Sequence, residues 1–294
     1  MRDKPLVSIL INNYNYGNYI SEAIRSALNQ TYRNIEIIVV DDGSTDNSRD
    51  IINSFRGILP VFKENGGQAS AFNIGFKYCK GEIICILDSD DIFHPNKVEI
   101  IVEYFKNNPG YDWLIHKMNH IDNNSNNVLI AEHEDISKLL SKSGDYRKKA
   151  KYGQIDFYLP ATSALAFRKS LIQKITPIPE KLRITADNYL KYASLMLSPV
   201  LVCNQVLSSQ RIHGNNLYTN QNRKTKDFRK KSRFIRYHVA SGLWNLEKKQ
   251  LQSGRIAFQV LKSSIRDFDV PMLIKSGFLL IKCLIGRIFN EERY

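Results

Sequence analysis

The stretch I-I-C-I-L-D-S-D-D at residues 83–91 decides the fold of this chain. Its five consecutive apolar residues predict a β-strand covered on both faces, as strands of parallel sheets are. The run ends in a group of acids, Asp88, Asp90 and Asp91. A buried strand that ends in carboxylates indicates an open α/β sheet with a polar site at the carboxyl ends of its strands.

The same pattern recurs toward the N-terminus. Apolar runs predict four strands in all, at 6–11, 35–40, 61–63 and 83–87. Helical spacing of apolar residues lies between and after them, at 19–29, 68–80 and 96–107. This alternation predicts an α/β fold with a doubly wound, mostly parallel sheet flanked by helices.

The remainder of the chain is less regular. We predict a hairpin over 113–130, a basic, mobile loop over 144–152 and strands at 165–167 and 200–208. After residue 220 the pattern becomes helical, with a break at Pro271.

Composition excludes several classes of protein. The 294 residues are 43% hydrophobic and 24% charged, which is typical of a globular chain and not of collagen, a disordered protein or a multi-span membrane protein. The four cysteines form no C-x-x-C pair, which favours a reducing, cytosolic compartment. The chain shows no apolar signal core and no long apolar stretch, so we expect no spanning helix.

Charge is distributed unevenly along the chain. The net charge is +13, and residues 221–294 hold 17 Lys and Arg against 6 acids. Within them, 274–289 has basic residues on one stripe of a helix and apolar residues on the other, which is typical of a helix that lies on an anionic membrane surface. Packing on the rest of the chain or on a partner explains the apolar face equally well. No nucleic-acid motif accompanies the charge.

Two acidic strand ends are candidates for chemistry. Asp88-Ser89-Asp90 suits a hard divalent cation, Mg²⁺ or Mn²⁺, since such ions prefer oxygen ligands. The alternative is an acidic turn before the helix that Pro95 opens. Asp42, with Asp41 beside it, can accept hydrogen bonds from a nucleotide base or ribose. There the alternative is a turn with a helix cap, because Ser44 and Asp46 are good cap residues.

The ordered motifs carry a family resemblance. They are V-S-I-L-I-N-N-Y-N-Y at 7–16, A-I-R-S-A-L-N-Q-T-Y at 23–32, I-E-I-I-V-V-D-D-G-S-T-D at 35–46, E-N-G-G-Q-A-S-A-F-N-I-G at 64–75 and G-E-I-I-C-I-L-D-S-D-D at 81–91. Together they closely resemble family 2 glycosyltransferases of the GT-A fold, which are nucleotide-diphospho-sugar transferases. The resemblance is continuous over 5–110 and thinner to about 216.

The resemblance implies roles for donor-binding residues. Asn12 and Tyr14 would line the nucleotide pocket, with Asn65 to Gln68 near the nucleoside. Asp42 would contact the base, with Asp41 beside it. Asp88 and Ser89 would lie near the ribose or sugar, and Asp90 on the metal. The turn at Thr162 and Ser163 would border the donor sugar.

Asp187 in R-I-T-A-D-N-Y-L at 183–190 resembles the family's catalytic base. An inverting transfer needs a group that takes the proton of the acceptor hydroxyl, and a carboxylate that holds the metal is unsuited to it. Relatives often carry an acid before the base, where this chain has Ala186. Without the resemblance, Asp187 reads as a helix N-cap.

The stretch Q-R-I-H-G-N-N at 210–216 resembles an R-x-H-x-x-N segment of many relatives. It implies that His213 completes the metal site and that Arg211 pairs with a phosphate, for which its planar fork is suited. A loop with incidental polar residues is the alternative. The Q-x-x-R-W motif of processive polysaccharide synthases is absent, which favours transfer of a single sugar.

The expected function is therefore a metal-dependent, inverting glycosyltransferase of the hexosyl or N-acetylhexosaminyl class. It would use a nucleotide-sugar donor, with UDP favoured, and a glycan or lipid-linked acceptor in polysaccharide biosynthesis at the cytosolic membrane face, through residues 270–294. We divide the chain into a GT-A catalytic domain, 1–220, and a basic helical extension, 221–294. The catalytic domain has a nucleotide-binding half, about 1–110, and an acceptor half, about 111–220.

Three other readings remain open. A sugar-nucleotide nucleotidyltransferase shares the fold class, although its G-x-G-x-R loop is replaced by Asn12-Asn13-Tyr14-Asn15. A non-catalytic nucleotide-sugar-binding subunit is disfavoured by the intact acids. A dehydrogenase is disfavoured because G-x-G-x-x-G appears nowhere. Self-association is left open.

Overall fold

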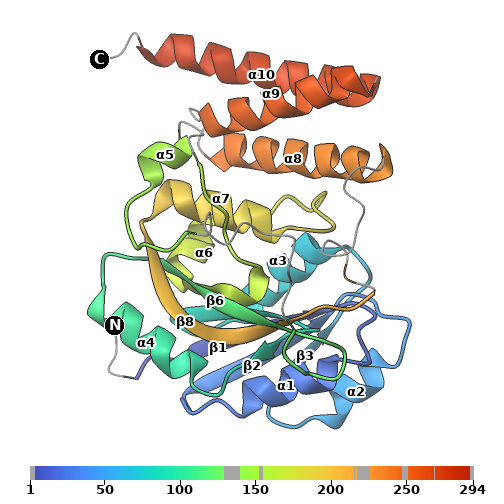
Figure 1. Cartoon of the computed structure of the whole chain (residues 1–294), viewed down its shortest axis with the longest axis vertical. Helices are drawn as coiled ribbons and strands as arrows, with labels where there is room; N and C mark the ends of the chain where they lie inside the picture. The colour runs from blue at the N-terminus through green and yellow to red at the C-terminus, as the bar shows by residue number, and fades with distance from the viewer. Residues whose placement is uncertain are drawn as a thin grey trace.

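A mixed sheet with helices on both faces forms the body of the molecule (Figure 1). The computed structural model describes residues 4–128, 140–151, 155–214, 216, 226–246, 251–267 and 269–291. Within these ranges the sheet has eight strands in the order β3-β2-β1-β4-β7-β6-β8-β5.

The first part of the sheet is parallel, as predicted. Its strands are β1 (Val7–Asn13), β2 (Ile35–Asp41), β3 (Leu59–Phe62) and β4 (Ile83–Asp88). The helices of this part are α1 (Ile20–Leu28), α2 (Ser48–Ser54), α3 (Gln68–Tyr78) and α4 (Lys97–Asn107). Predicted strands and helices are confirmed to within two residues because their apolar patterns are uninterrupted.

Alternate side chains of these strands enter two separate cores. Ile9 and Cys85 belong to the core on the side of α1 and α4, whereas Leu10 and Ile84 belong to the core on the side of α3 and α7. Successive strand residues point to opposite faces, so a continuous apolar run is the pattern that a doubly covered strand requires.

The second part of the sheet mixes strand directions. Its strands are β5 (Ile92–Phe93), β6 (Trp113–Ile121), β7 (Leu165–Arg168) and β8 (Val200–Arg211). β7 runs antiparallel to both β4 and β6, and β6 runs parallel to β8. Three further elements follow or precede these strands, η2 (Thr162–Ala164), α6 (Lys169–Ile175) and α7 (Asp187–Leu197).

Two predictions for this part need correction. The predicted hairpin is a single strand, β6, whose turn closes with one isolated bridge between Ile121 and Asn127; residues 129 and 130 lie outside the described ranges. The segment predicted as a mobile loop contains α5 (Arg147–Lys151). Its Ala150 is buried in the core, so packing of this residue favours helix where the local sequence is strongly basic.

Three helices stack above α7, with the last one outermost (Figure 1). They are α8 (Lys226–Leu246), α9 (Leu251–Arg266) and α10 (Val270–Glu291), and Pro271 stands in the first turn of α10, where its missing N–H costs nothing. Gly242 of α8 lies so close to α7 that a Cβ atom there would be 2.8 Å from the Tyr189 ring. Among the described residues no helix has the length and apolar character needed to cross a bilayer. All four cysteines are buried thiols.

The strand order creates one crevice. β1 lies between β2 and β4, so the chain leaves β1 toward one side of the sheet and later returns to the other. In register, Asn13 of β1 lies beside Asp41 of β2, and Asn12 lies beside Asp88 of β4. Both acidic strand ends thus meet at the point where ligands bind in open α/β sheets.

Candidate active site

A cavity of about 430 Å³ opens at the carboxyl ends of β1, β2 and β4. Ten residues predicted for the site line it: Asn12, Tyr14, Asp42, Asn65, Gln68, Asp88, Ser89, Asp90, Thr162 and Asp187. These residues come from strand ends, loops and helix starts that are distant in sequence. The tertiary structure therefore gathers them around one space that is large enough for a small ligand.

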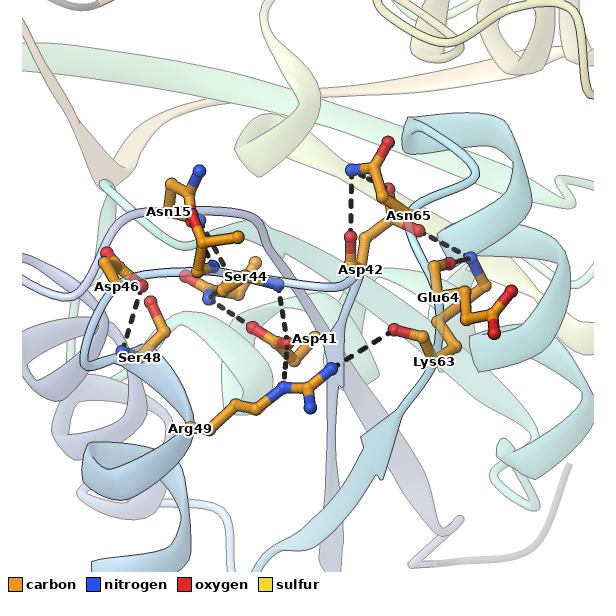
Figure 2. Close-up of polar contacts among 12 residues, drawn as sticks. Asn15, Asp41, Asp42, Ser44, Asp46, Ser48, Arg49, Lys63, Glu64 and Asn65 are labelled. Carbon is orange, nitrogen blue, oxygen red and sulfur yellow. Dashed lines mark hydrogen bonds and ion pairs between the residues drawn. The ribbon is translucent and has the colours of Figure 1, made fainter.

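The two neighbouring acids at the end of β2, Asp41 and Asp42, point in different directions (Figure 2). The Asp41 carboxylate is fully buried and accepts hydrogen bonds from Asn13 Nδ2 at 2.9 Å and Arg49 Nε at 3.2 Å. Asp41 is outside the cavity lining, so its contacts are structural and it supports the turn. Only Asp42 faces the cavity.

Asp42 is held by the segment that follows β3. Its carboxylate accepts the Gly66 N–H at 2.9 Å, the Gly67 N–H at 2.7 Å and Lys63 Nζ at 2.6 Å. Lys63 is a site residue that the sequence reasoning missed, and its position at the end of a short strand was the available signal. The ion pair and the two N–H donors fix the orientation of the Asp42 carboxylate at the cavity wall.

The loop before Asp187 is joined to the start of α3. Gln68 Oε1 accepts the Ala186 N–H at 2.8 Å, and Gln68 N donates to Arg183 O at 2.8 Å. Thr185 in this loop has φ +53°, an uncommon backbone conformation for a β-branched residue. Gln68 lines the cavity, and its side-chain carbonyl is occupied in holding the loop that carries Asp187.

The acids after β4 repel one another in a poorly solvated space. Loss of solvent, followed by Asp90 and then Asp187, raises the pKa of Asp88 to about 8. Loss of solvent, Asp90 and Asp88 also raise the pKa of Asp91 well above its usual range. Such a cluster calls for positive charge, because uncompensated carboxylates at this spacing cannot all ionise near neutral pH.

Asp90 is surrounded by the segment after β8. His213 Nε2 lies 3.1 Å from Asp90 Oδ2, and Asn216 Nδ2 donates to the same oxygen at 3.3 Å. The His213 ring stacks on Tyr19 with 4.7 Å between centroids. His213 thus contacts Asp90, the residue with which the metal site is predicted, although it does not itself line the cavity.

Arg211 occupies a different position from the one predicted. Its side chain is fully buried, and its guanidinium donates to Asp90 O at 3.1 Å, to Asp122 O at 2.9 Å and to Glu22 at 2.9 Å. It is outside the cavity lining. With its nitrogens committed to these partners, Arg211 supports the backbone of Asp90, and this arrangement disagrees with a direct phosphate contact.

The two hydroxyl residues of η2, Thr162 and Ser163, lie in different environments. Thr162 lines the cavity, whereas Ser163 is fully buried and its Oγ accepts the Asp88 N–H at 3.0 Å. Ser163 therefore orients β4 and stays outside the cavity lining. On β1, the side-chain amide atoms of Asn12 are buried and have no hydrogen-bond partner, as expected for a group that binds a ligand.

Asp187 opens α7 and is 8% exposed. Its carboxylate forms an ion pair with Lys191, one turn further along the helix, at 2.7 Å. Side chains four residues apart on a helix are neighbours, so the sequence could have indicated Lys191 as the partner of Asp187. Tyr16, Asp91, Arg183 and Asn216 also line the cavity and were not predicted as site residues.

A divalent cation fits this site only with help from its substrate. In the described part of the chain, no group of three or more His, Cys, Asp or Glu side chains is arranged to hold a metal ion. Asp90 and His213 could supply two ligands, and the mutual repulsion of Asp88, Asp90 and Asp91 favours a cation among them. Mg²⁺ is commonly held in this way, by one or two carboxylates together with substrate phosphates.

Comparisons with known proteins agree with the geometry. The family described as Glycosyl transferase family 2 matches residues 8–175. An uncharacterized glycosyltransferase of Nostoc sp. is 37% identical over 222 residues, which are 71% of this chain and 66% of that protein. One of Rickettsia typhi is 36% identical over 216 residues, with 71% and 64% covered. The matched part of the chain thus spans somewhat less than two thirds of the length of these relatives.

Solved structures share the fold at low sequence identity. Residues 1–349 of S. aureus TarS in complex with UDP-GlcNAc superpose with a TM-score of 0.64 at 18% identity, over 88% of this chain and 72% of that one. The mannosyltransferase PcManGT from Pyrobaculum calidifontis, in complex with GDP-Man and Mn²⁺, gives 0.55 at 13% identity, over 98% and 88%.

The crevice between β2 and β4, the acids at its rim and the mixed second half of the sheet define a GT-A type fold. Within that class, this chain belongs to glycosyl transferase family 2.

Proposed function

We propose that this protein transfers one sugar from a nucleotide-diphospho-sugar, with UDP favoured, to a hydroxyl group of a glycan or lipid-linked acceptor, with inversion at the anomeric carbon. The observation that carries the proposal is that Asp42, Asp90 and Asp187 line one cavity. The UDP-GlcNAc complex of the structurally similar TarS supports a UDP-linked donor.

Each acid has a separate task in this proposal. Asp42 accepts a hydrogen bond from an N–H of the base, and the free amide of Asn12 adds a further contact. Asp187 takes the proton of the acceptor hydroxyl as its oxygen attacks the anomeric carbon. The bond from that carbon to the diphosphate oxygen breaks, and the nucleoside diphosphate leaves with the electron pair. The first 220 residues are the catalytic domain in this proposal, and 221–294 are the extension.

Asp90 and His213, together with the donor diphosphate, would hold the divalent cation, Mn²⁺ or Mg²⁺. The cation would supply Lewis-acid stabilisation of the charge that develops on the leaving diphosphate. Asp88 would face the ribose or the sugar.

Metal dependence gives a direct test. We expect EDTA to reduce UDP release from UDP-GlcNAc to background, and added Mn²⁺ or Mg²⁺ to restore it, since metal stabilisation is worth several kcal/mol. Asp90→Asn should raise the Mn²⁺ concentration needed for half-maximal rate, whereas exposed Asp50→Asn on α2 should not. Full activity in EDTA contradicts the metal assignment.

A panel of nucleotide sugars and of acceptors separates the competing functions. A glycosyltransferase releases nucleoside diphosphate from a nucleotide sugar. A nucleotidyltransferase instead consumes nucleoside triphosphate and a sugar phosphate, and a non-catalytic subunit binds the donor without turnover. UDP release with a new glycosidic bond would support the proposal, and either of the other patterns would replace it.

The outermost helix supports binding to an anionic membrane surface, which we propose is the cytosolic face. One side of α10 packs inward through Met272, Ser276 and Leu279, and the opposite side exposes Val270, Ile274, Phe278 and Ile281, each more than half exposed. Lys275 and Lys282 flank this stripe and are exposed. The acids Asp267 and Asp269 both pair with buried Arg233, which compensates one of their two charges.

We expect the chain to sediment with vesicles that contain phosphatidylglycerol and to remain in solution with pure phosphatidylcholine. Each Lys near an anionic surface contributes about 1 kcal/mol. The double variant Ile274→Ser, Phe278→Ser should lose this binding. The control Tyr158→Ser, at an exposed aromatic residue that is distant from α10 in the sequence, should keep it. Unchanged binding of the double variant would exclude this stripe as the membrane contact, and a dimer in solution that the variant abolishes would assign it to self-association.

A further inference from the structure

A buried lysine stands next to the acid to which the proposed function assigns the role of base. Lys191 lies one turn after Asp187 on the same side of α7, with its Nζ 2.7 Å from Asp187 Oδ2. Lys191 is 7% exposed and Asp187 is 8% exposed. A solvated surface pair of this kind contributes little, but a pair withdrawn from water has a strong effect on how both side chains are oriented.

The lysine is anchored at a second point. Its Nζ also donates to Pro160 O at 3.2 Å, in the segment that leads to Thr162 at the cavity wall. The ammonium group therefore joins the start of α7 to the segment that precedes η2. Two anchors on separate segments restrict the ammonium, and through it the Asp187 carboxylate, to one arrangement.

The surrounding charges show why such an anchor is needed. Asp88 and Asp187 line the same cavity, and Lys191 contacts the Asp187 carboxylate. Among the described residues that line the cavity, Arg183 is the one cation, and its guanidinium donates to Asn65. Without Lys191, the Asp187 carboxylate would share the cavity with Asp88 and lose its ion-pair partner, and rotation away from Asp88 would relieve the repulsion.

We propose that Lys191 is a positioning residue for the base: it holds Asp187 Oδ2 and thereby directs the other carboxylate oxygen, Oδ1, to the hydroxyl proton of the acceptor. This inference rests on the proposed role of Asp187. In the sequence, Asp precedes Lys by four residues near a helix N-terminus, which is the favourable order for both the pair and the helix dipole.

A nucleophile that needs no catalytic base distinguishes a positioning role of Lys191 from a general effect of Lys191 on the fold. Water or an alcohol must lose a proton during attack on the anomeric carbon. Azide attacks the same carbon as an anion, forms a glycosyl azide and releases UDP with no proton to remove. The test therefore measures UDP release from UDP-GlcNAc with Mn²⁺, in buffer alone and with sodium azide.

For Lys191→Met we expect UDP release to water to fall about 10- to 100-fold, because a misplaced group loses effects of this size. The KM for UDP-GlcNAc should stay unchanged, and azide should restore release to the rate of the wild-type protein with azide. Lys191→Arg should recover part of the reaction with water. Lys191→Gln, which keeps a donor for Pro160 O, provides a second uncharged variant if the methionine variant folds poorly. Lys174→Met, at an exposed lysine of α6, is the control.

The outcomes distinguish two failures. If the uncharged variants lose the azide reaction as fully as the reaction with water, Lys191 acts on the fold and the inference is wrong. If Asp187→Asn itself keeps the reaction with water, Asp187 is not the base and the proposed function is wrong at that residue. Azide restoring both Asp187→Asn and Lys191→Met supports the pair acting together.

Discussion

Replacement of Asp187 by Asn is expected to reduce transfer about 10²- to 10⁴-fold, the usual contribution of a positioned general base. Asparagine has the same shape as aspartate, but its amide cannot accept the hydroxyl proton. In the proposed function, residues on other elements bind the nucleotide, and Asp42 is the candidate contact to the nucleobase. UDP affinity should therefore remain near its original value. Initial rates of UDP release with acceptor and titration calorimetry with UDP measure the two effects.

The specificity of this result depends on a matched substitution. Asp50→Asn makes the same chemical change at an exposed position on α2, outside the cavity lining, and should leave both rate and affinity unchanged. Near-normal transfer by Asp187→Asn would remove the base assignment. A loss of UDP affinity equal to the loss of rate would instead indicate that Asp187 contributes to donor binding.

Replacement of Arg211 by Met is expected to lower the free energy of unfolding by about 3 kcal/mol or more. The substitution leaves the half-buried carbonyls of Asp90 and Asp122 without their charged donor, and each such loss costs about 1–3 kcal/mol. It also removes the ion pair with Glu22 and the contact of the guanidinium with the Tyr19 ring. Urea unfolding followed by fluorescence measures the change.

This substitution also separates two assignments for Arg211. If the residue supports Asp90 from behind, stability and Mn²⁺ response should decline together, and a fully folded variant with only weakened UDP affinity would favour the phosphate contact. Arg56→Met, at an exposed arginine between α2 and β3, should change neither quantity.

An element was predicted well from the sequence where its local pattern of apolar residues matched its burial in the structure. Strands such as 83–88 are recognisable because both faces must be apolar, and the acids at their ends are conspicuous where apolar residues stop. In contrast, Ala150 lies in a basic segment whose pattern favours a loop, and its helix forms because Ala150 packs into the core. Local charge was a poor guide there, since tertiary contacts outweigh propensity.

Neighbouring residues of one motif illustrate the same limit at the site. Asp41 and Asp42 are chemically identical in the sequence, yet one is buried against Arg49 and the other faces the cavity. Ser163 and Thr162 divide in the same way. Strand residues alternate between faces and turns rotate each side chain separately, so adjacency in sequence does not imply a shared environment.

The sequence by itself determined that an α/β sheet carries acids at two strand ends and that Asp187 stands at a helix start, because apolar periodicity and its interruptions are local properties. Only the tertiary structure decided that these acids share one cavity, that Arg211 lies behind Asp90 and that Lys191 spans from Asp187 to Pro160. Those relations join segments far apart along the chain, and they depend on strand order and packing, which no local pattern encodes.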